Sequence, residues 1–114
     1  MAPSLKTIKS RTTFIMIKNK GNFIKGKCFN IVFLKKESLE NLIFVGYIST
    51  KKLGNAVKRN KAKRIMRELA RKVLIKFGKK NSFYVIIAKN SIFNTPITEQ
   101  ENELKKLISW CIKK

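Results

Sequence analysis

Residues 42–78 read LIFVGYISTKKLGNAVKRNKAKRIMRELARKVLIKFG. The first part, residues 42–50, predicts a strand because β-branched and aromatic residues dominate it. A long helix is predicted over residues 55–77. Asn55 belongs to the residue types favoured as helix N-caps, and Gly78 to those that end helices. A strand followed by a long, basic helix is therefore the centre of the predicted fold.

The predicted helix has two chemically different faces. At 100° per residue, one arc gathers the apolar residues Ala62, Ile65, Met66, Leu69 and Val73. The opposite arc gathers Asn60, Arg64, Arg67 and Arg71. The apolar arc is expected to face the core. The basic arc could be an ordinary solvated face or a binding surface, and the charge of the whole chain bears on that choice.

The 114-residue chain has 27 Lys and Arg against 6 acidic residues, a formal net charge of +21. So large a charge opposes compaction by self-repulsion and suits a polyanionic partner, with nucleic acid ahead of an anionic membrane surface. Glu68 is the only acid in 51–80, so the helix forgoes the ion pairs that stabilise exposed helices. Four of the five Arg lie within residues 59–71 of a Lys-rich chain, and Arg grips phosphate with two hydrogen bonds. The clustered Arg therefore favour a surface for phosphate or base-edge contacts over an ordinary solvated face.

Two residue types that protein nucleases use are missing. The chain has no His, and all six acids are Glu. A nuclease needs a carboxylate cluster for metal ions or a histidine for proton transfer, so a metal-dependent nuclease acting alone is disfavoured. Cys28 and Cys111 lack metal-ligand spacing and are expected to be reduced thiols of a cytoplasmic protein. No signal peptide or membrane span is expected either.

The remaining segments complete a predicted αββαβα order in one domain of residues 1–114. Residues 5–19 are weakly helical, residues 27–35 read as a strand, and there is room for one extra short strand around 22–25. The unbroken apolar run SFYVIIA at 82–88 predicts a buried strand. Thr98 begins a final helix, whose apolar stripe is Leu104, Leu107, Ile108 and Cys111. The fold class is therefore α+β, a sandwich of helices and a sheet.

The stretch STKKLGNAVKRNKAKRIMRE at 49–68 resembles the signature of the protein subunit of bacterial ribonuclease P. That family's pattern is a strand ending in Ser-Lys-Lys, an apolar residue and Gly, then Ala-Val, Arg-Asn-Arg and a Lys-Arg…Arg-Glu run. LKTIKSRTTF resembles the family's first helix, and SFYVIIAK its last strand. The resemblance covers nearly the whole chain, and about twenty residues carry most of its specificity.

The resemblance implies an α+β sandwich with a left-handed βαβ crossover at the basic helix. It implies a catalytic RNA subunit that, with Mg²⁺ bound mainly by that RNA, removes the 5′ leader from precursor tRNA. The protein would bind the catalytic RNA and the leader, and would not be catalytic alone. Neither a membrane nor a small-molecule substrate is expected.

Site residues carry over where they match the family pattern. The expected RNA-binding set is Lys51, Lys52, Arg59, Asn60, Lys61, Lys63, Arg64, Arg67 and Arg71, the last from the basic arc. The expected leader cleft, between the first helix and the sheet, is lined by Phe14, Lys18, Asn30 and Val32. Phe14 could equally be an ordinary core aromatic, and Asn30 and Val32 could belong to an uncovered sheet face.

Three positions depart from the family pattern. Lys61 stands where Arg is typical, which puts a two-pronged contact there in doubt. Lys18 stands where some members have an aromatic, exchanging stacking for a phosphate contact. Ser49-Thr50 precede the loop lysines and keep a hydroxyl. The alternative function, a basic ribosomal or general RNA-coating protein without a processing role, has the same charge but does not need the ordered motif.

Overall fold

One mixed five-stranded sheet organises the molecule, in the order β1-β4-β5-β3-β2. The computed structural model describes the backbone of residues 5–113 and the side chains of residues 5–111. The strands are β1 (Leu5–Thr7), β2 (Asn22–Ile24), β3 (Phe29–Lys35), β4 (Ile43–Ile48) and β5 (Ser82–Ala88). β4 pairs in parallel with β1 and β5, whereas β3 pairs antiparallel with β2 and β5. The predicted strand at 82–88 and the extra strand near 22–25 are confirmed.

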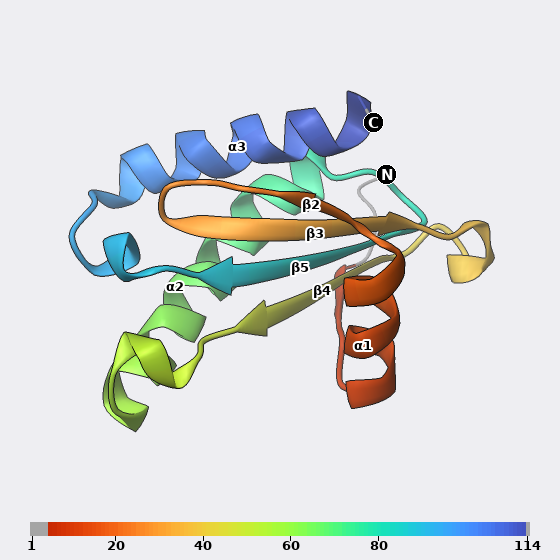
Figure 1. The fold of residues 1–114 in the computed structure, drawn as a ribbon. Helices are drawn as coiled ribbons and strands as arrows, with labels where there is room; N and C mark the ends of the chain where they lie inside the picture. The colour runs from red at the N-terminus through yellow and green to blue at the C-terminus, as the bar shows by residue number, and fades with distance from the viewer. Residues whose placement is uncertain (1–4, 114) are drawn as a thin grey trace.

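Three helices pack on this sheet: α1 (Arg11–Lys20), α2 (Ala56–Phe77) and α3 (Ile97–Lys113). β4, α2 and β5 form the predicted crossover between adjacent parallel strands. Figure 1 shows α2 behind the sheet, with β4 and β5 both pointing left and β5 above β4, which makes the crossover left-handed. Most βαβ units are right-handed. The left-handed path keeps α2 off the face that α1 occupies.

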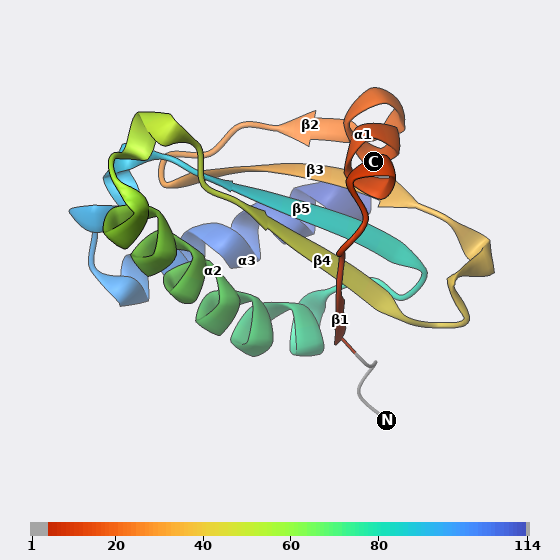
Figure 2. The same cartoon turned by 90° about the horizontal axis from the view of Figure 1, so that it is seen from below.

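The two faces of the sheet are covered unequally. α2 and α3 lie on one face and α1 on the other (Figure 2). The larger core lies under α2 and α3 and includes Phe29, Ile31 and Tyr84 from the strands. The smaller cluster lies under α1, around Ile17 and Val32. Because α1 is a short helix, it covers only part of its face and leaves room for a groove beside it.

The N-terminal segment differs from its prediction. A helix was expected over residues 5–19, but Leu5–Thr7 forms β1, paired with Ile43–Val45 of β4. The helix begins after Ser10, whose Oγ accepts a hydrogen bond from the Thr13 amide at 3.4 Å. Sheet pairing supplies the amide and carbonyl partners of this short segment, and weak helical periodicity cannot compete with it. The observed order is therefore βαβββαβα rather than αββαβα.

The long helix α2 matches its prediction closely. Asn55 is the N-cap, and the amide of Gly78 donates to the carbonyl of Leu74 at the other end. Ala62, Met66, Leu69 and Val73 are buried, and Ile65 packs against the same core. In α3, the predicted stripe of Leu104, Leu107, Ile108 and Cys111 is buried as well. Local periodicity was sufficient for both helices.

Replacing the N-cap, Asn55→Ala, is expected to lower the free energy of unfolding by about 1 kcal/mol. The Asn55 Oδ1 accepts a hydrogen bond from the Lys58 amide at 3.0 Å, which alanine cannot replace. Urea unfolding measures the change. Asn102→Ala, at an exposed position inside α3, is the matched control and should be neutral or slightly stabilising. Equal losses for the two variants would contradict a capping role.

Candidate nucleic-acid interface

The basic arc of α2 faces solvent, opposite the buried arc. Asn60, Arg64, Arg67 and Arg71 are all exposed. Arg59, in the first turn, is half-buried, and Lys61 and Lys63 are exposed. Within the described residues, the salt bridges join Lys35 to Glu37 and Lys105 to Glu101, and none includes a basic residue of α2. These cations are therefore not neutralised within the protein.

A short 3-10 turn, Lys51–Leu53, places the two loop lysines next to this helix. Leu53 is buried, whereas Lys51 and Lys52 are exposed. Gly54, which joins the turn to α2, has φ of 126°, a conformation that favours glycine. Leu53 thus anchors the turn in the core, and Gly54 redirects the chain so that both lysines extend the basic surface of α2.

A groove of about 560 Å³ runs between α1 and the exposed part of the sheet. Of the four predicted cleft residues, Phe14, Lys18 and Val32 line it. Its wall is mostly apolar and includes two exposed side chains, Ile15 at 50% and Phe23 at 56%. Apolar groups so exposed are suited to contact with a ligand such as a nucleobase. We call this hollow the α1 groove.

Phe14 lies directly over Gly46 of β4. A Cβ atom on Gly46 would come within 2.4 Å of the Phe14 ring, so the ring can occupy this position only because residue 46 is glycine. The ring also packs against the smaller hydrophobic cluster. Phe14 is therefore half-buried: part of the ring belongs to the core, and part lines the α1 groove.

Asn30 lies on the same face of the sheet as Val32, next to Ile87 of β5, but at the hairpin end of that face. It is not among the residues that line the α1 groove. Its Oδ1 accepts a hydrogen bond from the Gly26 amide at 3.1 Å, within the β2–β3 hairpin. This bond holds the Asn30 side chain near the hairpin turn. The structure thus brings three of the four predicted cleft residues together, and the fourth supports the hairpin.

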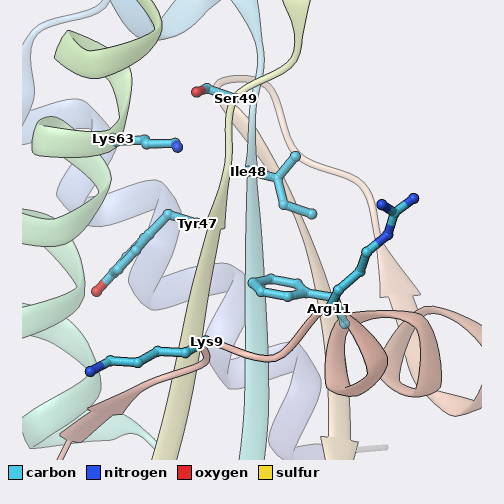
Figure 3. Close-up of a pocket in the computed structure, with 7 residues that line it drawn as sticks. Lys9, Arg11, Tyr47, Ile48, Ser49 and Lys63 are labelled. Atoms are coloured by element: carbon cyan, nitrogen blue, oxygen red, sulfur yellow. The ribbon is translucent and has the colours of Figure 1, made fainter.

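A second hollow, of about 360 Å³, lies between α1 and α2. Figure 3 shows Lys63 reaching from α2 toward β4 near Ser49, with Tyr47 and then Lys9 farther along the hollow and Arg11 on the α1 side. The residues that line this hollow are Lys9, Arg11, Phe14, Tyr47, Ile48, Ser49 and Lys63. Only Phe14 and Lys63 belong to the predicted site.

A third hollow, of about 520 Å³, lies between β1 and α2. Arg67 and Arg71 line it from the helix, and Lys6 lines it from β1. Tyr47 lines it as well, and the Cζ of Arg67 lies 6.0 Å from the centroid of the Tyr47 ring. Burial raises the pKa of the Tyr47 hydroxyl, and the charges of Arg67 and Arg71 oppose that rise. The phenol is therefore neutral at physiological pH, and its ring lies among cations.

Sequence reasoning missed Lys6, Lys9, Arg11 and Tyr47. Lys6, Lys9 and Arg11 all fall in the segment predicted as helical, residues 5–19, and Tyr47 falls in a predicted strand with no assigned role. The available signal was the spacing of Lys6, Lys9 and Arg11 within a segment without acids. That signal does not reveal α2 as the facing element, because only the fold brings the two segments together.

The combined surface is suited to binding a polyanion. It offers guanidinium and ammonium groups for phosphates and exposed aromatic rings for bases. Across residues 5–113, no three His, Cys, Asp or Glu side chains are grouped as metal ligands would be. Nor does that part of the chain contain a helix of the length and hydropathy that membrane crossing requires.

Comparisons with known proteins identify relatives of this chain in sequence and in fold. The family model described as Ribonuclease P matches residues 2–111. The ribonuclease P protein component of Mesoplasma florum is 34% identical over 90% of this chain and 92% of that protein. The ribonuclease P protein component of Ruegeria pomeroyi is 51% identical over 43% of this chain and 39% of that protein. The match to two Caulobacter vibrioides relatives covers 54% of each of those proteins, so the chain spans about half the length, or less, of these three curated relatives. The Staphylococcus aureus RNase P protein structure superposes with a TM-score of 0.76 at 26% identity, covering 90% of this chain and 92% of that one.

Proposed function

The chain belongs to the ribonuclease P protein family, and from that premise we propose that it is the protein component of the tRNA-processing endoribonuclease. It binds the catalytic RNA and the 5′ leader of precursor tRNA, and it assists Mg²⁺-dependent removal of the leader. The RNA subunit carries the chemistry, and the protein alone is not catalytic. The complex works in the cytoplasm.

One observation carries this proposal: an unneutralised basic helix and a largely apolar groove meet at the β4 edge of one sheet. Lys63 of α2 and Phe14 of α1 line the same hollow. The helix matches the phosphate backbone of a folded RNA, which is bound through charge. The groove matches unpaired bases, which stack on aromatic side chains. A precursor tRNA bound to a catalytic RNA presents both kinds of ligand.

Mg²⁺ enters this proposal as an ion of the RNA subunit. The residues of the described chain do not fit a metal site, because carboxylates, cysteines and histidines are nowhere grouped in it. The cations of the protein instead reduce the repulsion between the phosphates of two RNA molecules. The protein should therefore matter most where Mg²⁺ is too dilute to screen that repulsion.

The experiment is cleavage of a precursor tRNA by a bacterial ribonuclease P RNA at low Mg²⁺, with and without this protein. Restored 5′ maturation is the expected result. The protein alone, incubated with the same substrate, should leave it intact. Binding to the RNA without any gain in cleavage, with a well-matched partner RNA, would instead favour a coating protein.

Phe14→Ala is expected to weaken binding of leader-bearing precursor tRNA by roughly 5- to 150-fold, the range for loss of one stacked base. Binding of mature tRNA should be unchanged, because it has no leader to place in the α1 groove. Affinities of the reconstituted complex for both RNAs measure the difference. Phe77→Ala, which removes a ring exposed at the far end of α2, is the matched control. Equal losses on both RNAs would contradict the cleft assignment.

A further inference from the structure

The three hollows adjoin one another around the edge of the sheet, because each neighbouring pair shares lining residues. The α1 groove and the second hollow share Arg11, Phe14 and Ile48. The second and third hollows share Tyr47. A strand in the α1 groove can therefore continue past Tyr47 to the space between β1 and α2 without leaving the protein surface. The β4 edge is open at this point, because β1 pairs only with Ile43–Val45.

The hollow between β1 and α2 has the chemistry of a nucleic-acid site. Lys6, Arg67 and Arg71 line it, and among the residues that the structure describes no glutamate lines any of the three hollows. Tyr47 lies at the junction, half-buried, with Arg67 beside its ring. An aromatic ring among cations is the arrangement that holds single-stranded RNA, with a base on the ring and phosphates on the charges.

Resting on the proposed function, we propose that the leader does not end in the α1 groove. It continues across Tyr47 into the groove between β1 and α2, where a leader base stacks on Tyr47 and Lys6, Arg67 and Arg71 hold its phosphates. Arg67 and Arg71 then serve the leader, while the loop lysines and the first turns of α2 remain for the catalytic RNA.

Two observations favour the leader over a segment of the catalytic RNA. The hollow between β1 and α2 adjoins the second hollow, which adjoins the α1 groove, so one strand following this path needs no second RNA. Stacking on Tyr47 also requires an unpaired base, and the leader is the single-stranded part of the precursor. Arg67 and Arg71 line the same hollow as Tyr47, so their charges lie where the phosphates of a base stacked on Tyr47 would be.

Leaders lengthened one nucleotide at a time test the proposal. With the unmodified protein, affinity for the precursor should rise as the α1 groove fills, and then rise again when the leader reaches Tyr47. Tyr47→Leu should remove only the second rise, a loss of roughly 5- to 150-fold for long leaders. Tyr47→Phe keeps the ring and should keep the second rise. Leucine also retains apolar packing against the core, which protects the fold.

The outcomes separate this proposal from the proposed function. If affinity stops rising once the α1 groove is full, or if Tyr47→Leu weakens all leader lengths alike, the extended path is wrong while the α1 groove can still hold the leader. If leader length never affects affinity, the proposed leader binding fails as well. A second rise that Tyr47→Leu abolishes and Tyr47→Phe retains supports the extended path.

Photo-crosslinking identifies the RNA directly. Thr7 is exposed on β1 and lines the groove, and both native cysteines are buried, so Thr7→Cys can be labelled selectively. A crosslinker on Thr7→Cys should join leader nucleotides different from those joined by one on Lys18→Cys in the α1 groove. Crosslinks from position 7 to the catalytic RNA alone would overturn the proposal.

Discussion

A fourfold rise in salt concentration is expected to weaken RNA binding by this protein by about two to four orders of magnitude. If the protein neutralises roughly six to eight phosphates, log K should fall against log salt with a slope of about −4 to −7. Filter binding or fluorescence anisotropy with the catalytic RNA, over a salt series, measures the slope. A slope near −1 would contradict a broad phosphate-binding surface.

The structure explains why the salt effect should be so large. The basic residues of α2 make no salt bridge with a glutamate of the described chain. Each is therefore available to a phosphate, and each contact releases a counterion. The loop lysines extend the same surface beyond the helix. A surface already neutralised by acids would release far fewer ions.

Single substitutions divide this effect among residues. Arg64→Gln removes one exposed charge of the basic arc and should reduce the slope by about 1, with similar losses for any RNA sequence. Lys105→Gln is the matched control, because Lys105 lies on α3 and already faces Glu101 at 3.6 Å. Its slope should match that of the unmodified protein. If only the Lys105→Gln control reduced the slope, the result would indicate that RNA binds at α3 and not at the basic arc of α2.

Gly46→Val is expected to destabilise the fold by about 1–3 kcal/mol, the usual cost of overpacking. Even the first added carbon would lie within 2.4 Å of the Phe14 ring, so the ring and α1 must move. The displaced ring would also enter the α1 groove, and leader binding should weaken with it. Valine has the higher strand propensity, so a gain in stability would show that packing against Phe14 does not decide the outcome.

The double variant Gly46→Val, Phe14→Ala isolates the clash. Without the Phe14 ring there is space for the new side chain, so Gly46→Val should cost much less in the Phe14→Ala background. Urea unfolding of the four proteins gives the interaction free energy between the two sites. Additive losses would mean that the strain arises elsewhere, for example at Ile8, whose Cδ1 lies 3.4 Å from the same Cβ position.

The sequence was most informative where the cause of structure is local. The Asn55 cap, the Gly78 end and the two arcs of α2 all depend on residues within a few turns of one another. The strand β5 was also predicted correctly, because a strand buried on both faces has an unbroken run of apolar residues. The N-terminal strand was not predicted. Leu5–Thr7 is only three residues long, and its partners, Ile43–Val45, lie far along the chain. No local pattern encodes that pairing.

The residues of the candidate site also fall into two groups, those predicted from local sequence features and those placed only by the fold. The basic arc follows from charge and helical period. The loop lysines, Phe14 and Val32 were assigned from the family motif, and Lys18 as a departure from it; Phe14, Lys18 and Val32 line one groove in the structure. The motif also assigned Asn30 to the cleft, and that assignment stays a prediction: Asn30 lies on the groove face beside Ile87, hydrogen-bonded to Gly26 at the hairpin end and outside the lining residues. Which side chains of a sheet line a groove depends on what covers that sheet, and a strand pattern does not contain that information.

By itself, the sequence determined that this protein has one long helix with a core face and a basic face, and that the few acidic residues of the chain cannot neutralise the basic face. Only the tertiary structure placed Lys6, Lys9 and Tyr47 beside that helix. The left-handed crossover and the edge strand β1 bring Lys6 and Tyr47 to Arg67 and Arg71, and Lys9 to the hollow that Lys63 lines. Charge and periodicity act within one element, whereas a groove forms between elements and exists only once they have packed.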